Sequence, residues 1–419
     1  MMAVAIPLLV LLATLGLPLF AVLAAGGLLA AHQAGLDPAV LIIELNRISS
    51  SPNLIAIPLF TFAGVVLAAG GSPQRLITFF NAFLGWLPGG LGSVALTVCA
   101  FFTAFSGASG VTILALGGML YPMLRQVGYP ERFCLGLLTS SGSLGILFAP
   151  SLAVLVYGIV AGVSIDQLFL AGIVPGFILL AMLIGYSFVA GLKAHLPHHP
   201  FELRAIWPAF RKSIWDLFLP FGILIGIFGG FVTVSEVSAC TAAYVLFIEC
   251  VVHRTISLHR QLTELIREAS ILVGSLLIIL GVAMGLTNIM IDAQIPMQLL
   301  AWVETHVDSH LQFLLLLNLF LLVVGAMMDI FSAMIVMVPL ILPLAQRYGV
   351  DPVHLGIIML ANLELGYSTP PVGLNLFIAC QRFKKPVLSL FRATLPFLAI
   401  MLVWLVIVTY LPQTSLWWR

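Results

Sequence analysis

Charged side chains are scarce in this 419-residue sequence, in which 8% of the residues are Asp, Glu, Lys or Arg and 61% are apolar. Soluble globular domains carry about 25% charged residues, so this composition excludes an ordinary soluble fold. The formal net charge of +1 is close to neutral, and we expect no nucleic-acid partner. The chain has instead the composition of a polytopic protein that uses the bilayer as its solvent.

Cysteine and clustered metal ligands are also scarce. The five cysteines are scattered and no CxxC pair occurs, which argues against a disulfide framework and against a transition-metal site. Most of the nine histidines lie near expected connections between helices, where polar interfacial residues are common. An intramembrane enzyme needs a dense group of His, Asp, Glu or Ser at one depth. No such group occurs in the sequence, so we expect neither an enzyme nor a bound cofactor.

Long runs without charge define the expected membrane segments. Residues 1–36 have no basic leader and form too long a run for a cleaved signal peptide, so we interpret them as a retained span. Residues 76–124 are 49 consecutive uncharged residues, which would extend about 74 Å as one helix, more than twice the bilayer core. The chain must therefore reverse inside this run, and FSGASG (105–110) marks the place. GAMMDIFS (325–332) interrupts a second run, and the two interruptions predict two re-entrant hairpins made of short pieces.

The sequence repeats itself weakly at a constant offset of 221 residues. Pro150 matches Pro371, within the segments SSGSLGILFAPSLAVLVYG (140–158) and ANLELGYSTPPVGLNLFIA (361–379). Proline removes a backbone donor and clashes with the preceding turn, and the neighbouring glycines loosen the backbone. We therefore predict two broken transmembrane helices in corresponding positions of two halves.

The distribution of basic residues predicts the orientation. Basic residues follow the first half and also the span 235–252, and the positive-inside rule assigns both groups to the cytoplasm. The first hairpin then enters the membrane from inside and the second from outside, which makes an inverted repeat. The N-terminus is expected in the cytoplasm and the C-terminus in the periplasm, with about nine spans besides the hairpins.

The expected fold class is an all-α polytopic membrane protein with an inverted repeat, two re-entrant hairpins and two broken transmembrane helices. Each half also contains an amphipathic arm that would lie along the interface. The predicted parts are a first inverted repeat over 1–192, with its arm over 33–47 and its broken helix at 140–151; a connecting segment and span over 193–234; a second inverted repeat over 235–412, with its arm over 254–268 and its broken helix at 361–373; and a tail over 413–419.

Broken helices are suited to hold ions. They expose carbonyls, which bind Na⁺ without a fixed negative charge, and N–H groups, which attract a carboxylate. Paired breaks in inverted repeats are typical of secondary transporters. The expected cation-binding residues are Ser106, Gly107, Ser109, Gly142, Gly145, Asp329, Gly366, Thr369 and Pro370. The expected substrate-binding residues are Ser143, Pro150, Ser151, Asn362 and Asn375.

Several polar residues have alternative interpretations. Asp329 is either a ligand near the site or a structural hydrogen-bond acceptor, and Glu364 is either a structural partner or a direct ligand. Glu236 and Glu249 lie on another span, where contact with a partner subunit explains them equally well. The serine hydroxyls of the first break could bond back to helix carbonyls. No Lys or Arg falls inside an expected core segment, so we expect no buried arginine to bind the substrate anion.

The two break segments resemble the signature segments of a known family. SSGSLGILFAPSLAVLVYGIVAGVSIDQLFLAGIVPG and NLELGYSTPPVGLNLF are similar to those of the large membrane subunit of tripartite ATP-independent periplasmic (TRAP) transporters. MVPLILPLAQRYGVDPVHLGIIMLANLELG extends the resemblance, which covers nearly the whole chain. One departure is Ala149-Pro150 in the first break, where the family commonly has two prolines, whereas the second break keeps Pro370-Pro371.

The resemblance implies a fold of the ion-transporter superfamily and an elevator-type motion. It implies two partners, a small four-helix membrane subunit and a periplasmic substrate-binding protein. It also implies Na⁺ symport of a small organic anion, such as a dicarboxylate, keto acid or sugar acid, across the bacterial inner membrane. The alternative is a self-sufficient Na⁺/dicarboxylate symporter of the same fold that needs no binding protein.

Overall fold

The computed structural model describes residues 17–35, 52–107, 109–194, 203–257, 261–294 and 309–419, with a few isolated residues between these ranges. Every regular element in this part of the chain is a helix. Six of the described helices are long and apolar enough to cross a membrane, or eight if each of two bent helix pairs forms one span. Much of the predicted first span and of the arm over 33–47 lies outside the described residues.

The described part of the first half begins with a short apolar helix, α2 (Leu19–Ala34). The elements that follow are η1 (Pro52–Ile55), α4 (Ala56–Ala69), α5 (Ser72–Leu84), α6 (Gly90–Ser106), α7 (Ser109–Val127), α8 (Glu131–Ser140), the 3-10 helix η2 (Ser141–Leu147), α9 (Leu152–Ala161) and α10 (Ile165–Lys193). Two junctions are sharp bends, since α4 meets α5 at 72° and the continuous α8–η2 helix meets α9 at 45°. The second of these bends is the first predicted helix break.

The connecting segment and the second half are also helical where described. Their elements are α11 (Leu203–Phe228), α12 (Val234–Phe247), the π-helix η3 (Ile248–Val252), α13 (Leu262–Asp292), α15 (His310–Met327), α16 (Ile330–Arg347), α17 (Pro352–Gly366), α18 (Leu374–Phe383), α19 (Val387–Tyr410) and η4 (Pro412–Thr414). The predicted arm over 254–268 is not a separate helix, because residues 262–268 are the first turns of the 31-residue helix α13. No Gly or Pro separates this polar stretch from the apolar run after it, so the helix continues.

Local sequence determines several helix ends. Thr233 and Glu236 form a capping box at the start of α12, which gives Glu236 a structural role within the chain. Asp351 caps α17 by accepting hydrogen bonds from two backbone amides. α6 ends at Gly107, whose φ of 63° lies in the left-handed region that glycine adopts without steric penalty.

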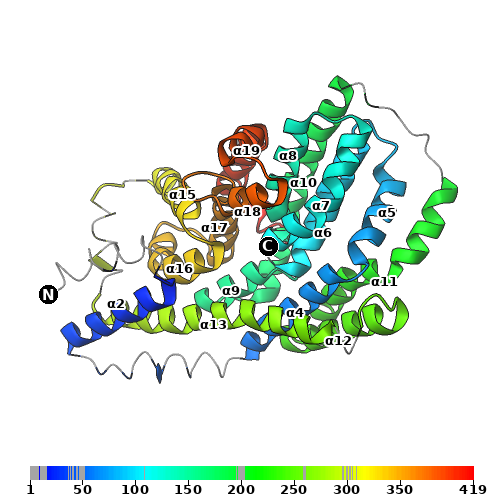
Figure 1. Cartoon of the computed structure of the whole chain (residues 1–419). Helices are drawn as coiled ribbons and strands as arrows, with labels where there is room; N and C mark the ends of the chain where they lie inside the picture. Colours follow the sequence, from blue (N-terminus) through cyan, green and yellow to red (C-terminus); the bar gives the residue numbers. More distant parts are fainter. Residues whose placement is uncertain are drawn as a thin grey trace.

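Helices in the two halves correspond at nearly the same offset as the sequence match. α6, α7, α9 and α10 begin at residues 90, 109, 152 and 165, and α15, α16, α18 and α19 begin at 310, 330, 374 and 387. The contacts correspond as well, because α7 packs on α18 while α16 packs on α9. Figure 1 shows the yellow and orange helices of the second half beside the cyan and teal helices of the first. The two halves therefore share one core.

Two hydrogen bonds join the halves within this core. The hydroxyl of Tyr157 on α9 donates to the carbonyl oxygen of Pro352 at 2.5 Å. The indole N–H of Trp404 on α19 donates to the carbonyl oxygen of Pro175 at 2.9 Å. Both aromatic side chains are fully buried. Each therefore places a large apolar surface in the core while its hydroxyl or indole N–H group has a hydrogen-bond acceptor.

The two predicted hairpins differ in shape. α6 and α7 lie against each other around the tip at 105–110, whereas α15 packs mainly on α17 and only slightly on α16. α15 and α16 each have 18 residues and are both among the helices long enough to span. The sequence therefore locates the second helix interruption correctly within 325–332, but the pieces beside it are longer than the prediction of short pieces required.

Candidate ion and substrate site

The tip of the first hairpin lies against the first helix break. A Cβ on Gly107 would lie 2.5 Å from Cδ1 of Leu152, at the start of α9. A Cβ on Gly145 would lie 2.2 Å from the carbonyl oxygen of Ala100, so η2 rests directly on the backbone of α6. The first-half residues predicted to bind a cation are thereby brought together, and all are buried: Ser106, Gly107, Ser109, Gly142 and Gly145.

Two threonines that the sequence analysis missed lie within this cluster. The hydroxyl of Thr103 donates to the carbonyl oxygen of Gly142 at 2.8 Å and lies 2.7 Å from the hydroxyl of Thr112. The hydroxyl of Ser106 lies 3.5 Å from that of Thr112, and both threonine side chains are fully buried. In the sequence, the only feature that could have indicated them is that each is a hydroxyl residue in an apolar run, one about a turn before the tip and the other about a turn after it.

The second tip meets the second break in a similar way. The backbones of Gly325 and Gly366 are in direct contact, since a Cβ on Gly366 would lie 2.3 Å from the carbonyl carbon of Gly325. The amides of Val372 and Gly373 both donate to the carbonyl oxygen of Ala326, at 3.0 and 3.3 Å. The backbone of the break is thus held directly by the backbone of the tip.

The predicted cation-binding side chains of the second half have distinct surroundings. Asp329 accepts hydrogen bonds from two amides in the first turn of α16 and caps that helix. Thr369 donates to the carbonyl one turn before it at 3.0 Å, which leaves its oxygen lone pairs available. Pro370 is exposed. The hydroxyl of Tyr367, which the sequence analysis missed, accepts a hydrogen bond from the amide of Ile330 at 2.5 Å.

Buried polar atoms without a hydrogen-bond partner gather at the breaks. Eleven of the described side chains carry such an atom, and eight of these lie in 140–151, in 361–375 or at the second tip. The eight are Ser140, Ser141, Ser151, Ser332, Asn362, Glu364, Ser368 and Asn375. An unsatisfied buried polar group costs about 1–3 kcal/mol, and native proteins leave few of them. The breaks therefore have unused capacity to bind a ligand.

The predicted substrate-binding residues differ in how many of their polar atoms already have a hydrogen-bond partner within the chain. The hydroxyl of Ser151 and both amide atoms of Asn375 are buried without a partner. Asn362 donates its amide group to Oδ1 of Asn318 at 2.6 Å and so joins α17 to α15, although its own oxygen has no partner. Ser143 bonds back to a carbonyl one turn before it at 3.4 Å.

The two breaks adjoin each other. Glu364 is fully buried on α17 and lies beside Ser143 of η2, without a hydrogen bond to either carboxylate oxygen. α17 also packs on η2 and α9. Both breaks contain a cis peptide bond, Ala149-Pro150 in the first and Pro370-Pro371 in the second. The single proline of the first break therefore occupies the position that corresponds to the second proline of the other.

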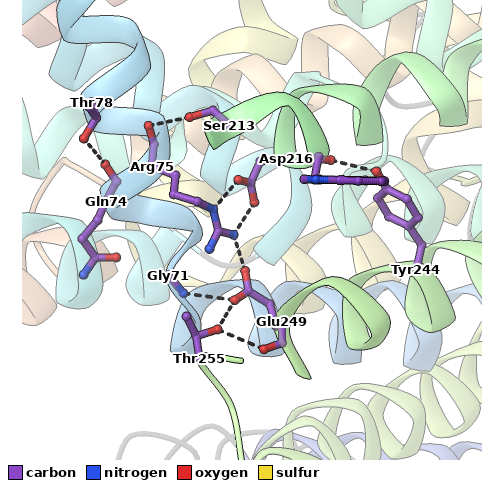
Figure 2. Close-up of polar contacts among 10 residues, drawn as sticks. Gly71, Gln74, Arg75, Thr78, Ser213, Asp216, Tyr244, Glu249 and Thr255 are labelled. Carbon is purple, nitrogen blue, oxygen red and sulfur yellow. Dashed lines mark hydrogen bonds and ion pairs between the residues drawn. The ribbon is translucent and has the colours of Figure 1, made fainter. Parts of the chain in front are cut away.

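A further polar cluster lies at the bend between α4 and α5 (Figure 2). Arg75 is 12% exposed and pairs with Asp216 on α11 at 2.6 Å and with Glu249, so its charge is taken up by carboxylates of the same chain. The fully buried Glu249 also accepts hydrogen bonds from the amide of Gly71 and the hydroxyl of Thr255. Its interpretation as a partner-subunit contact is therefore wrong. In the sequence, Arg75 is a single charged residue between two uncharged runs, a pattern typical of a residue in a connecting loop.

The sequence of this chain matches a known protein family. A family model described as Tripartite ATP-independent periplasmic transporter, DctM component, matches residues 2–414. The chain belongs to this family. The match includes both tips and both breaks, so the residues that carry the resemblance in the sequence lie within the family domain.

Individual relatives of the TRAP family agree with this assignment. The chain is 37% identical over 377 residues to the C4-dicarboxylate TRAP transporter large permease protein DctM of Pseudomonas aeruginosa, covering 90% of this chain and 88% of that protein. It is 35% identical over 374 residues to the isethionate TRAP transporter permease protein DctMQ of Oleidesulfovibrio alaskensis, covering 88% of this chain and 58% of that protein. These relatives are transporter permeases by name, and the chain is accordingly a multi-pass TRAP large permease.

A solved structure has a similar fold. The crystal structure of the Alcanivorax borkumensis YdaH transporter matches with a TM-score of 0.51 and 14% sequence identity, over 85% of this chain and 86% of that one. At this identity the likeness concerns the fold alone. It supports the all-helical fold of the described residues.

Proposed function

We propose that the chain is the large subunit of a secondary transporter that imports a small organic anion by Na⁺ symport. The observation that carries this proposal is the contact of each tip with a helix break, where buried hydroxyl and amide groups lack partners. Neutral oxygen donors are suited to bind a monovalent cation, and helix N-termini are suited to bind a carboxylate. One entering charge gains about 2.3 kcal/mol per 100 mV, and a tenfold Na⁺ gradient adds about 1.4 kcal/mol.

The proposal assigns a Na⁺ site to each pair of tip and break. Carbonyls and hydroxyls of the first pair would hold one ion, and those of the second pair the other. The first set is Ser106, Gly107, Ser109, Gly142 and Gly145, with Thr103 and Thr112 beside them. The second set is Asp329, Gly366, Thr369 and Pro370.

The substrate anion would lie where the two breaks adjoin. α9 begins directly after Pro150 and Ser151, and α18 begins at Leu374 after the second break. The first amides of α9 have no partner within their helix and attract negative charge, whereas in α18 the amide of Asn375 already donates to the carbonyl oxygen of Tyr367. Ser151 and Asn375 supply unpaired polar groups there, and Ser143 and the free oxygen of Asn362 complete the proposed set.

An inverted repeat with an elevator-type motion accounts for the corresponding contacts of the two halves. α7 with α18, and α16 with α9, place a helix that follows each tip against the broken helix of the other half. The tips and breaks would then move as one unit against the remaining helices. The proposed division keeps repeats over 1–192 and 235–412, a connection over 193–234 and a tail over 413–419. The N-terminus is proposed to be cytoplasmic and the C-terminus periplasmic.

Two partners belong to the proposal, a periplasmic binding protein and a small four-helix membrane subunit. Two relatives of 37% and 35% identity carry different substrates in their names, which fits a substrate chosen by a separate binding protein. This chain covers only 58% of the relative named DctMQ, which leaves room in that protein for a further subunit. The alternative remains a self-sufficient Na⁺/dicarboxylate symporter of the inner membrane.

Reconstitution tests the proposal. The chain is placed in proteoliposomes with the small subunit, and uptake of labelled organic acids is measured with and without the binding protein under an inward Na⁺ gradient. We expect uptake to require both Na⁺ and the binding protein. Uptake without the binding protein would support the self-sufficient symporter. Uptake that persists without Na⁺ and collapses with the proton gradient would overturn Na⁺ symport.

A further inference from the structure

A basic surface forms where the ends of two distant segments meet. It contains six cationic side chains from 125–132 and 382–392: Arg125, Arg132, Arg382, Lys384, Lys385 and Arg392. The packing of α7 on α18 and of α8 on α19 brings these segments together. The whole chain has a net charge of only +1, so this concentration of cations is a local feature.

Direct contacts join the two segments of the basic surface. Arg132 donates two hydrogen bonds to the carbonyl oxygen of Arg392, at 2.9 and 3.3 Å. Lys385 Nζ lies 2.7 Å from Oε1 of Glu131. The cations therefore share one surface and are not merely close in projection.

The end of α18 is seated on two glycines of α7. A Cβ on Gly118 would lie 1.3 Å from Nη2 of Arg382, and a Cβ on Gly117 would lie 3.0 Å from Cζ of Phe383. The ring of Phe383 also packs on that of Tyr121, with centroids 5.4 Å apart. This packing holds the adjoining cations against α7.

The basic surface has too few acids to balance its cations. Glu131 is the one carboxylate that the described contacts place among them, and it pairs with Lys385. That hydrogen bond raises the pKa of Lys385, so the lysine stays charged. Arg125 and Arg132 donate to backbone carbonyls instead. Six cations against one carboxylate leave a local charge of +5, which attracts anions from outside the chain.

Exposed apolar side chains continue directly from the basic surface. On α19, Leu388, Leu395 and Leu402 are 60%, 44% and 47% exposed, and this helix is long enough to span the membrane. A cluster of four to eight cations at the end of a membrane span is typical of contact with anionic lipid. A free anion would neutralise the charge but leave the leucines uncovered, so the combination favours a lipid.

We propose that this basic surface binds the phosphate groups of anionic phospholipids at the boundary between membrane and water. The headgroup neutralises Arg382, Lys384 and Arg392, and the acyl chains cover the leucines of α19.

Lipid binding to the purified full-length chain tests the proposal without any transport assay. Fluorescent phosphatidylglycerol and phosphatidylcholine are titrated against the wild type, the triple variant R382Q/K384Q/R392Q, and the control R204Q/R211Q/K212Q, which removes three cations elsewhere. We expect phosphatidylglycerol to bind about tenfold or more tightly than phosphatidylcholine, and the triple variant, but not the control, to lose this preference. Equal binding of the two lipids, or an equal loss in both variants, would overturn the proposal.

Two further measurements separate lipid from free anion and binding from folding. Inorganic phosphate is titrated alone and as a competitor, and we expect it to compete poorly. If phosphate displaces the lipid at concentrations that match its own binding, the surface is a free-anion site and the lipid proposal fails. The variant R382K/R392K keeps the charge, so we expect it to keep the preference for phosphatidylglycerol. Its loss in a variant with wild-type thermal stability would also contradict the proposal.

Discussion

At the residue scale, the candidate site is built largely from groups that carry no charge. Thr103, Thr112, Ser151 and Asn375 contribute hydroxyl or amide groups, all of them buried. Asp329 carries a charge near the second tip, but its side chain already caps α16. Neutral donors lower the desolvation penalty of a site inside the membrane, and they leave the charge of the bound state to the ions themselves.

Thr369→Val tests whether the second break binds the coupling ion. The change keeps the shape of the side chain and removes a hydroxyl oxygen, and a lost ligand costs about 1–3 kcal/mol. We expect the Na⁺ concentration for half-maximal uptake to rise about 5- to 150-fold, measured by Na⁺ titration in proteoliposomes. Thr61→Val is the matched control, because Thr61 also bonds back to a carbonyl one turn before it. A wild-type titration for Thr369→Val would assign the hydroxyl to packing.

Asp329→Asn and Asp329→Ala separate a helix cap from a cation ligand. Asn also caps helices well, so Asp329→Asn keeps the start of α16 while removing the negative charge, whereas Asp329→Ala loses about 1 kcal/mol of stability with the cap. We expect both variants to weaken Na⁺ affinity, and only Asp329→Ala to lower the thermal unfolding midpoint. If Asp329→Asn retains wild-type Na⁺ dependence, the residue is a cap only.

At the element scale, each tip and each break depend on close approach of two backbones. Gly145 lies on the backbone of α6, and Gly366 lies on Gly325. Neither contact leaves room for a Cβ, so the geometry of the breaks is maintained by backbone packing as well as by prolines. The same element pairs carry the proposed ions, which couples ion binding to the separation of tip and break.

Gly145→Ala and Gly366→Ala should both separate a tip from its break. A Cβ would lie 2.2 Å from Ala100 O in the first case and 2.3 Å from Gly325 C in the second, and forced overpacking costs typically about 1–3 kcal/mol. We expect both variants to lose most uptake and to unfold at a lower temperature in detergent. Gly185→Ala and Gly274→Ala are matched controls, because nothing lies within 4 Å of a Cβ at either helix position. Unimpaired uptake by Gly145→Ala and Gly366→Ala would mean that the contacts adjust freely.

At the scale of the whole molecule, the two halves share a core and the ion pairs of Arg75 join elements outside the breaks. Arg75 on α5 connects to Asp216 on α11 and to Glu249 in η3, directly after α12 (Figure 2). The carboxylate of Glu249 also fills the space beside Gly70, where a Cβ would lie 2.5 Å from its Cδ. One cluster thus stabilises the 72° bend between α4 and α5 and attaches it to the connecting helices.

Glu249→Ala is expected to destabilise the whole protein strongly. It removes a buried partner of Arg75 and leaves the amide of Gly71 without its acceptor, and breaking a buried ion pair costs about 3–5 kcal/mol. The thermal unfolding midpoint in detergent measures the effect, and Glu249→Gln should have a smaller one because it keeps the volume and an acceptor. Arg419→Gln, which breaks the more exposed pair with Asp351, is the control and should change little. Equal midpoints for Glu249→Ala and Arg419→Gln would contradict a stabilising role of the cluster.

The sequence predicted much of the fold through rules that act over a few residues. Pro150 and Pro371 lie in real breaks because proline lacks a backbone donor, and FSGASG holds a real reversal because Gly107 adopts a positive φ. The arm over 254–268 failed for the opposite reason, since polar composition alone does not end a helix. Boundaries that depend on a specific breaker were predictable, and a boundary inferred from polarity was not.

Composition, proline, glycine and hydropathy determined by themselves that this is a multi-pass membrane protein with two broken helices, because each of these signals is local or summed along the chain. The role as a transporter subunit came from the resemblance of the break segments to the TRAP family. Only the tertiary structure decided that Thr103 lies against Gly142, that Asn362 pairs with Asn318, and that Arg75 pairs with two carboxylates. These contacts join residues far apart in the chain. No local spacing encodes which distant side chain will satisfy a buried polar group, because packing of whole helices selects the partner.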